Sequence, residues 1–258
     1  MTNIHPTAIV SPKARLCENL TVGPYAIIHD DVEIGNNCSI GPHAVIYDGA
    51  RIGNNVRIYQ GASISHVPQD LKFDGGPTEF IIGDNTTIHE YVTLHRGTHE
   101  TGKSVIGKNC LFMAYTHIAH DCRVGDNCII ANGVQVGGHA VIEDWVTIGG
   151  MTPVHQFCKI GQHSMIGGGF RVVQDIPPFI LAGNEPLTYS GLNIIGLRRR
   201  GFSNEDINIL KLAYTYIYNS GLNFSKGKEK VQQELGYHPL VQKILEFMSK
   251  SKRGIINK

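Results

Sequence analysis

The sequence predicts a mainly β fold, a parallel β-helix of hexapeptide repeats, with a small α-helical domain at its C-terminal end. The first observation is a period of six: from Val10 to Val172, outside two breaks, every sixth residue is large and apolar. The second is that Gly often follows it, with Asn or Asp next, residues that tolerate the positive φ of a tight corner. The third is a mostly small residue at the fifth position. A hexapeptide period is typical of a parallel β-helix, in which three hexapeptides close one triangular coil.

The repeats run over residues 10–64, 82–94 and 106–172, and two segments interrupt them. In residues 65–78, Asp70 and Gly76 occupy positions where the frame requires aliphatic residues. In residues 95–103, Glu100 does the same. Such segments do not fit the wall of the prism, so we expect both to project as loops. Loops on a rigid scaffold often carry function, although a tolerated insertion without a role is the alternative.

Residues 1–183 are expected to form the β-helix, and residues 184–258 the helical domain. Pro177-Pro178 ends the repeats, and residues 183–201 are read as irregular. Ser203 is expected to cap a helix that Gly221 ends. Its apolar residues follow helical spacing, and residues 225–251 are expected to hold two more short helices. These helices would cover the open strand edges at the end of the prism.

Bulk properties exclude several classes of function. The formal charge is +1 over 258 residues, so nothing favours nucleic acid or an anionic membrane surface. The N-terminus lacks a basic and apolar leader, and no apolar run is long enough to span a membrane, so the cytoplasm is the expected location. Five of the six cysteines occupy the small interior position and are expected to be structural.

A group of histidines is expected at one corner of the prism. Three faces of six residues give a coil of about 18 residues, so residues one coil apart stack about 4.8 Å apart along the axis. One such column and its neighbours contain His117, His120, Gly138, His139, His155 and Gln156. The first projecting loop begins on the same column, which would let Asp70 and Lys72 reach this region.

Three interpretations of this corner remain open on the residues alone. His120 beside Asp121 suits proton abstraction near neutral pH, and Gly137-Gly138 would let backbone N–H groups approach an oxyanion. The imidazoles could instead ligate zinc, as in carbonic anhydrases of this fold class. The third interpretation is a structural β-helix with incidental surface histidines. The run Arg198-Arg199-Arg200 either binds phosphate or is a solvated charge run.

Four segments carry a resemblance to a known family. They are residues 117–122 (His-Ile-Ala-His-Asp-Cys), 149–157 (Gly-Gly-Met-Thr-Pro-Val-His-Gln-Phe), 69–72 (Gln-Asp-Leu-Lys) and 199–203 (Arg-Arg-Gly-Phe-Ser). Together they resemble the UDP-N-acetylglucosamine O-acyltransferases that start lipid A biosynthesis. The likeness covers essentially the whole chain. It implies a left-handed β-helix, a homotrimer with sites between subunits, and no cofactor beyond the phosphopantetheine of acyl carrier protein.

The resemblance also implies a reaction and roles for particular residues. A 3-hydroxyacyl chain would pass from acyl carrier protein to the 3-hydroxyl of the UDP-sugar. By resemblance His120 is the general base, Asp121 orients it, the Gly138 N–H stabilises the oxyanion and Gly168 limits acyl length. The residues that would line the sugar, nucleotide and acyl-donor sites are Asp70, Lys72, His95, His117, His139, His155, Gln156, Asn193, Arg199 and Arg200.

The chain departs from the family pattern at two places. Ile195 stands where the known members carry an acidic residue, and residues 184–187 (Asn-Glu-Pro-Leu) lack the expected histidine. Both departures fall in residues 184–200, which contain Asn193, Arg199 and Arg200 and which the resemblance assigns to nucleotide contacts; we call them the nucleotide segment. A related UDP-amino-sugar, acylated in amide linkage, is therefore kept as an alternative substrate, and a metal-dependent enzyme of the carbonic anhydrase type as an alternative function.

Overall fold

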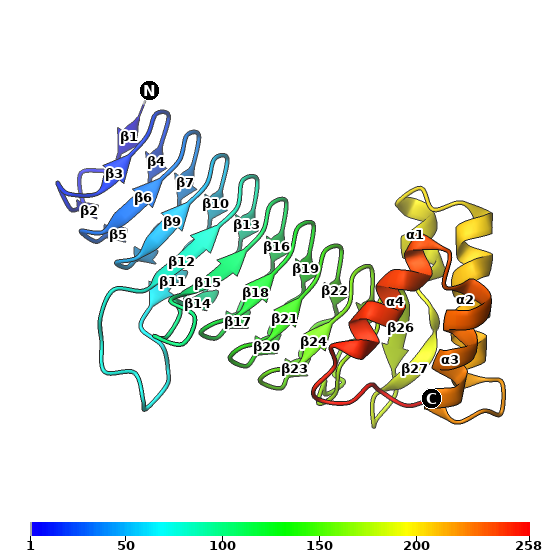
Figure 1. Ribbon diagram of the computed structural model, residues 1–258. Coiled ribbons are helices and arrows are strands. Elements are labelled where there is room, and N and C mark those ends of the chain that lie inside the picture. Colours follow the sequence, from blue (N-terminus) through cyan, green and yellow to red (C-terminus); the bar gives the residue numbers. More distant parts are fainter. Residues whose placement is uncertain (1) are drawn as a thin grey trace.

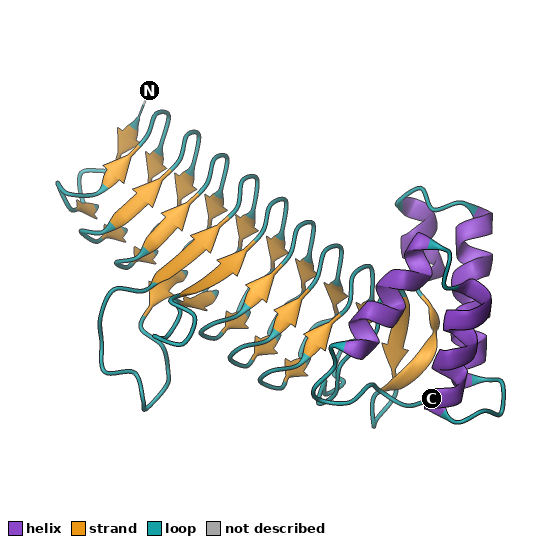
Figure 2. Cartoon of the chain, in the orientation of Figure 1, coloured by secondary structure: helices purple, strands orange, loops and turns teal. Residues whose placement is uncertain are grey.

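The computed structural model describes residues 2–258 and is a parallel β-helix with helices at its C-terminal end (Figures 1 and 2). Its strands form three sheets, one per face of the prism. The first contains Asn3–Ile4 (β1), Thr21–Val22 (β4), Ser39–Ile40 (β7), Arg57–Ile58 (β10), Thr87–Ile88 (β13), Leu111–Phe112 (β16), Ile129–Ile130 (β19), Thr147–Ile148 (β22), Met165–Ile166 (β25), Ile180–Gly183 (β26) and Thr188–Leu192 (β27).

The other two sheets have eight strands each. The second contains Ile9–Val10 (β2), Ile27–Ile28 (β5), Val45–Ile46 (β8), Ser63–His66 (β11), Thr93–His95 (β14), His117–Ile118 (β17), Gln135–Val136 (β20) and Pro153–Val154 (β23). The third contains Arg15–Leu16 (β3), Val32–Ile34 (β6), Ala50–Ile52 (β9), Glu79–Ile82 (β12), Lys103–Ile106 (β15), Arg123–Val124 (β18), Val141–Ile142 (β21) and Lys159–Ile160 (β24).

The interior of the prism is filled by the residues of the apolar frame, as predicted. From Val22 onward the frame residues are at most 5 % exposed, whereas Val10 and Leu16, at the open N-terminal end, are half-buried. The five cysteines predicted to lie inside are buried, and Cys17 is exposed.

The corners differ from the prediction. The positive φ falls three residues after the frame residue, where Asn37 (φ 58°) has it but so do Tyr25 and Trp145. The glycine that follows the frame residue has no positive φ; at Gly35 a Cβ would lie 2.7 Å from the Gly53 carbonyl, so glycine is needed there for the close approach of the next coil.

The two interruptions lie where the sequence places them, and the pairing register shows how much chain each adds. Within regular repeats, partners are 18 residues apart, as between Asn37 and Asn55. Across the first interruption Asn55 contacts Asn85, 30 residues on, and across the second Asn85 contacts Asn109, 24 residues on. The insertions are whole multiples of the hexapeptide, so the frame resumes without a shift. The first loop projects between β11 and β12 (Figure 1).

Four helices follow the last repeats: Ile194–Arg199 (α1), Asn204–Tyr218 (α2), Phe224–Leu235 (α3) and Pro239–Ser249 (α4). Ser203 caps α2 in a reciprocal capping box with Asp206, so the predicted start of this helix is confirmed. The two later helices are confirmed as well. Tyr214 of α2 is fully buried and donates to the Pro178 carbonyl at 2.6 Å, which fastens the helices to the end of the prism.

The reading of residues 183–201 as irregular is wrong. β26 continues the first sheet in parallel with β25, and β27 pairs with β26 in the antiparallel direction. This hairpin pairs with the open edge of the last coil, and no local sequence pattern predicts that pairing. Asn193 then caps α1, a helix of six residues that is too short for a periodic pattern. The hairpin spans residue 183, so the boundary drawn there between the two domains stays a prediction.

Between residues 2 and 258, no helix combines the length and the apolar character that crossing a membrane requires.

Candidate active site

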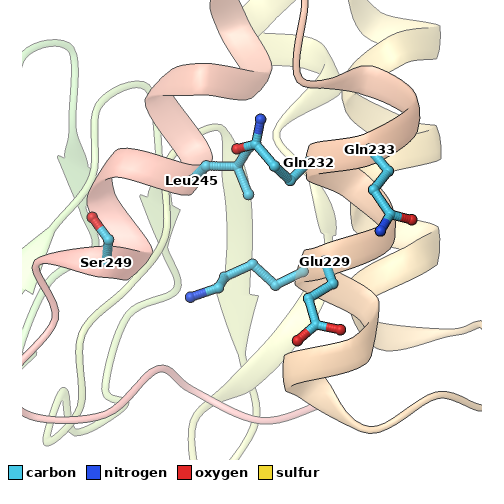
Figure 3. A pocket seen from close by; sticks show the side chains of 6 residues that line it. Glu229, Gln232, Gln233, Leu245 and Ser249 are labelled. Carbon is cyan, nitrogen blue, oxygen red and sulfur yellow. The ribbon is translucent and has the colours of Figure 1, made fainter.

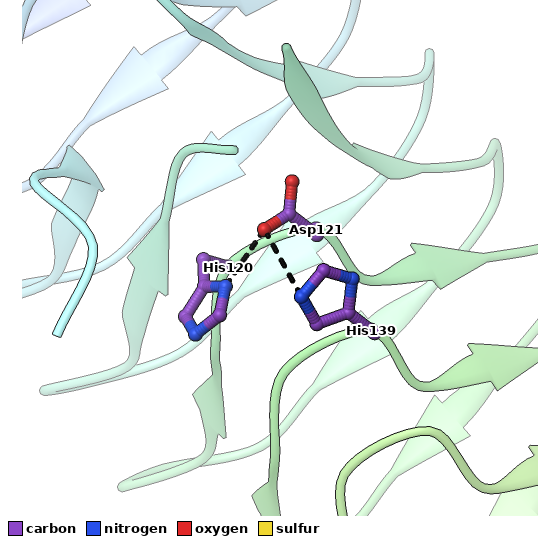
Figure 4. Close-up of side chains that lie close together, drawn as sticks. All are labelled: His120, Asp121 and His139. Atoms are coloured by element: carbon purple, nitrogen blue, oxygen red, sulfur yellow. Dashed lines mark hydrogen bonds and ion pairs between the residues drawn. The ribbon is translucent and has the colours of Figure 1, made fainter. Parts of the chain in front are cut away.

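The predicted corner brings His120, Asp121 and His139 together (Figure 4). The first two follow β17, and His139 follows β20 on the next coil. His120 Nδ1 lies 2.7 Å from Asp121 Oδ2, and His139 Nε2 lies 3.6 Å from the same oxygen. Both imidazoles are 14 % exposed, and the Asp121 side chain is fully buried. The imidazoles therefore reach the surface while the carboxylate between them does not.

The second projecting loop holds Asp121 in place. The Thr98 backbone N–H donates to Oδ1 at 3.0 Å and its hydroxyl donates to Oδ2 at 2.8 Å. The Thr101 hydroxyl also donates to Oδ1. Burial raises the pKa of Asp121, but the hydrogen bonds from Thr101, His120 and Thr98 outweigh it, so the pKa lies below its ordinary value. Asp121 is therefore an ionised, fixed partner for His120.

Gly138 leaves the space that the His120 ring occupies. A Cβ at this position would lie 2.7 Å from His120 Cε1 and 2.8 Å from Nε2, closer than atoms pack. The Gly138 N–H donates to no protein acceptor in residues 2–258, although the residue is buried. His120 Nε2 likewise has no hydrogen-bond partner within this range. A basic nitrogen and an unused N–H donor therefore lie next to each other.

A second run of imidazoles, His66, His95 and His117, stacks along neighbouring coils of the second sheet. The His66 and His95 ring centroids are 5.4 Å apart, and those of His95 and His117 are 4.9 Å apart. His95 is 4 % exposed, and its Nδ1 has no partner within the described chain. Burial, together with the charges of His117, His66 and His120, lowers the pKa of His95 to about 4. His95 is therefore neutral near pH 7.

This histidine makes stability depend on pH. The unfolded chain binds a proton at His95 near pH 6.5, whereas the folded chain does so only near pH 4. Stability is therefore intact above pH 6.5, falls as the pH drops through this window, and levels off below it. The shift corresponds to about 3 kcal/mol. Melting curves between about pH 7 and pH 4.5 should show a smaller loss for His95→Gln than for the wild type. Equal losses would contradict this assignment.

Asp70 and Lys72 lie on the first projecting loop and do not contact the corner within this chain. Asp70 Oδ1 accepts from the Lys72 N–H at 2.9 Å, a local turn. The loop is joined to the second loop further along, where His99 Nε2 lies 2.8 Å from Asp74 Oδ1. The predicted reach of Asp70 and Lys72 to the site therefore stays a prediction.

His155 and Gln156 lie one coil beyond His139, where they contact the C-terminal segment. Arg253 Nη2 lies 2.6 Å from His155 Nδ1, and the Gln156 carbonyl accepts from the same nitrogen at 2.9 Å. Arg253 was not predicted, because it is 98 residues from His155 and lies outside the repeats. Thr98, Thr101 and Glu100 were missed for a similar reason, since only the loop conformation brings them to the corner.

The predicted nucleotide residues form a separate group near the helices. The Asn193 side chain accepts from the Gly196 N–H and donates to the His163 carbonyl, so it caps α1. Arg200 lies 5.2 Å over the Trp145 ring and 3.2 Å from His163 Nδ1. Burial, with the charges of Arg200 and Lys243, lowers the pKa of His163 to about 4. Arg199 is exposed.

Gly168 and a cavity between two of the helices lie apart from these residues. Gly168 is exposed, and a Cβ there would lie 3.0 Å from the Gly150 carbonyl oxygen. A cavity of about 320 Å³ lies between α3 and α4 (Figure 3). None of the predicted site residues lines it; the lining residues are Lys228, Glu229, Gln232, Gln233, Leu245 and Ser249. We therefore place the candidate site at the His120 corner.

Comparison with known proteins shows which family the chain resembles. Residues 175–256 match the family model described as UDP-N-acetylglucosamine O-acyltransferase, domain 2, and residues 13–48, 31–66 and 103–138 match the bacterial transferase hexapeptide model. The chain is 49 % identical over 257 residues to an acyl-[acyl-carrier-protein]–UDP-N-acetylglucosamine O-acyltransferase from Halorhodospira halophila, covering 99 % of this chain and 100 % of that one. A counterpart from Thiobacillus denitrificans is 46 % identical, with the same coverage.

Solved structures give the same result. A UDP-N-acetylglucosamine acyltransferase from Bacteroides fragilis is 45 % identical, with a TM-score of 0.97 over 99 % of this chain and 100 % of that one. The corresponding enzyme from Francisella novicida is 34 % identical, with a TM-score of 0.96 over 99 % of this chain and 94 % of that one. The predicted fold, a left-handed parallel β-helix with C-terminal helices, is confirmed.

Proposed function

The chain belongs to the UDP-N-acetylglucosamine O-acyltransferase family, and we infer that it transfers a 3-hydroxyacyl chain from acyl carrier protein to the 3-hydroxyl of UDP-N-acetylglucosamine. It is an acyltransferase, and acyl transfer to this sugar nucleotide is the first step of lipid A biosynthesis. The observation that carries the mechanism is the His120–Asp121 pair beside the unused N–H of Gly138.

His120 acts as the general base. The Nδ1–H donates to Asp121, so Nε2 carries the lone pair and accepts the proton of the sugar hydroxyl as its oxygen attacks the thioester carbonyl. Asp121 stabilises the imidazolium that forms, because it is ionised, buried and fixed by the second loop. Thr98 and Thr101 therefore contribute to catalysis by positioning the carboxylate.

The Gly138 N–H stabilises the oxyanion. The tetrahedral intermediate carries a negative charge on the former carbonyl oxygen, and a preorganised backbone donor lowers its free energy. The intermediate then collapses, the C–S bond breaks, and the phosphopantetheine sulfur takes the proton from the His120 imidazolium. The ester forms with no covalent enzyme intermediate. Atoms and charge balance without a further co-reactant, so the reaction requires no cofactor.

The remaining residues are proposed to bind the substrates. Those near the corner, His95, His117, His139, His155 and Gln156, would contact the sugar and the acyl donor. Asp70 and Lys72 approach from the first projecting loop, and Asn193, Arg199 and Arg200 from the nucleotide segment. Neither group contacts His120 within one chain, which fits a homotrimer in which sites lie between neighbouring subunits. We place the enzyme in the cytoplasm, where acyl carrier protein is charged.

An acyl-transfer assay tests this function. The purified protein is mixed with UDP-N-acetylglucosamine and 3-hydroxyacyl carrier proteins of several chain lengths, with and without a chelator. We expect ester formation that the chelator does not abolish. A UDP-sugar with a 3-amino group is assayed in parallel, because amide formation with that sugar alone would replace the proposed acceptor. Activity that disappears with the chelator would instead favour the metal-dependent interpretation.

Gly168 is proposed to set acyl length. Glycine leaves the surface beside Gly150 open, and a longer side chain would fill the space that the end of the acyl chain occupies. We expect Gly168→Met to prefer donors several carbons shorter than the wild type does, with an unchanged KM for the UDP-sugar. Competition between donors of mixed length measures this preference. An unchanged preference in Gly168→Met would contradict the role.

A further inference from the structure

The Glu100 carboxylate lies at the catalytic corner, and no step of the proposed reaction uses it. It is a possible metal ligand in addition to His120, Asp121 and His139. Glu100 Oε2 lies 3.6 Å from His139 Nε2, and Asp121 Oδ2 lies 3.6 Å from the same nitrogen. The ligand atoms of His120, Asp121 and His139 lie within 4.8 Å of one another. Two imidazoles and one carboxylate therefore form a compact group (Figure 4), and the Glu100 carboxylate contacts this group through His139.

We propose that His120, Asp121, His139 and Glu100 form a zinc site, and that zinc bound there inhibits the enzyme. Imidazole and carboxylate are zinc ligands at about 2.0–2.2 Å, so the donor atoms of a tetrahedral site lie about 3.4 Å apart. Two of the observed separations are 3.6 Å. The third, 2.7 Å between His120 Nδ1 and Asp121, is a hydrogen bond that widens when metal replaces its proton.

The ligands combine fixed and adjustable groups. Asp121 is held by Thr98 and Thr101, and the His139 ring stacks on Phe157 with centroids 4.6 Å apart. Glu100 is the opposite case, since its side chain is 70 % exposed and no hydrogen bond restrains its carboxylate within the described chain. A fixed pair of ligands lowers the cost of assembling the site, and within residues 2–258 the exposed Glu100 side chain is free of hydrogen bonds that would prevent it from turning toward the metal as the fourth ligand.

Inhibition follows from the tautomer that the metal imposes, and this step rests on the proposed role of His120. Zinc takes the Nδ1 lone pair, so the remaining ring proton resides on Nε2. That nitrogen then donates a hydrogen bond and has no lone pair for the sugar hydroxyl. The bound metal also neutralises the carboxylate charge that would stabilise an imidazolium. Zinc thus removes the base without blocking the nucleotide segment.

The first test measures binding without turnover. Metal-free full-length protein is titrated with Co²⁺, whose visible absorption reports tetrahedral coordination, and Zn²⁺ is then added to displace it. Glu100→Gln is compared with Glu90→Gln, a matched control because Glu90 also pairs with a histidine, His89, at 3.3 Å. Loss of an outer-shell partner costs about 10- to 100-fold in metal affinity, so loss of a direct ligand should cost at least tenfold.

The second test measures how zinc inhibits acyl transfer. For each variant, the rate with zinc is divided by the rate of the same variant without metal. We expect wild type and Glu90→Gln to be inhibited alike, and Glu100→Gln to require at least tenfold more zinc. Equal zinc affinity in Glu100→Gln and wild type would overturn the site. Zinc that binds at the corner without inhibiting would overturn the inhibition and the assignment of His120 as base. Absence of binding, with a wild type that transfers acyl chains normally, would overturn this inference alone.

Discussion

Replacing His120 by alanine is expected to lower kcat by about a thousandfold and to leave KM for both substrates nearly unchanged, because general base catalysis contributes about 10²- to 10⁴-fold. The imidazole acts on the hydroxyl proton only as the carbon–oxygen bond forms. Its removal therefore raises the free energy of the transition state without weakening the ground-state complex. Steady-state kinetics with UDP-N-acetylglucosamine and a 3-hydroxyacyl carrier protein measures both parameters.

The control for this variant is His89→Ala, which removes another histidine that pairs with a neighbouring carboxylate, Glu90, away from the corner. We expect it to keep wild-type kcat and KM. His120 is 14 % exposed and fills no core position, so the melting temperature of His120→Ala should also stay close to that of the wild type. A His120→Ala enzyme that retained more than about a tenth of kcat would exclude the base role.

Most of the fold could be predicted because the β-helix is a one-dimensional repeat. Each coil contacts only its neighbours, so the inward position of Ile64 or Ile118 follows from counting and requires no tertiary knowledge. The six-residue count also holds across the two loops, because each loop adds a whole number of hexapeptides. It fails at the end of the repeats. The β26–β27 hairpin pairs with an edge that exists only once the prism has formed, and α1 is too short to show a period.

The residues of the candidate site likewise fall into those that follow the repeat and those that lie in irregular segments. The positions of His120, Gly138 and His139 follow from the column of 18-residue steps, so the His120 corner could be located from the sequence. The Thr98 and Thr101 hydroxyls that fix Asp121 lie in a loop that follows no period, and no local signal indicates their direction. Arg253 reaches His155 from the far end of the chain. Interactions that depend on irregular backbone could be found only in three dimensions.

Gly138→Ala is expected to lower kcat by about a hundredfold, the effect of misplacing a catalytic group by roughly 1 Å. The new Cβ would lie 2.7 Å from His120 Cε1, so the ring must move. The backbone at Gly138 does not require a positive φ, so alanine fits the main chain and the protein should fold normally. Gly183→Ala is the matched control, because its Cβ would meet only two side-chain atoms, the Ser190 hydroxyl oxygen at 3.3 Å and Phe170 Cε2 at 3.9 Å.

A double-mutant cycle separates crowding of the ring from loss of the oxyanion donor. Alanine keeps the N–H of residue 138, so its cost should arise through His120. In a His120→Ala background no ring remains to be displaced, and Gly138→Ala should then cost less than about threefold, a strong coupling between the two positions. If the full hundredfold loss persisted in that background, the effect of residue 138 would be independent of the base. The substitution would then act by moving the N–H of residue 138. This result would support the N–H as oxyanion donor and would contradict crowding of the His120 ring as the cause.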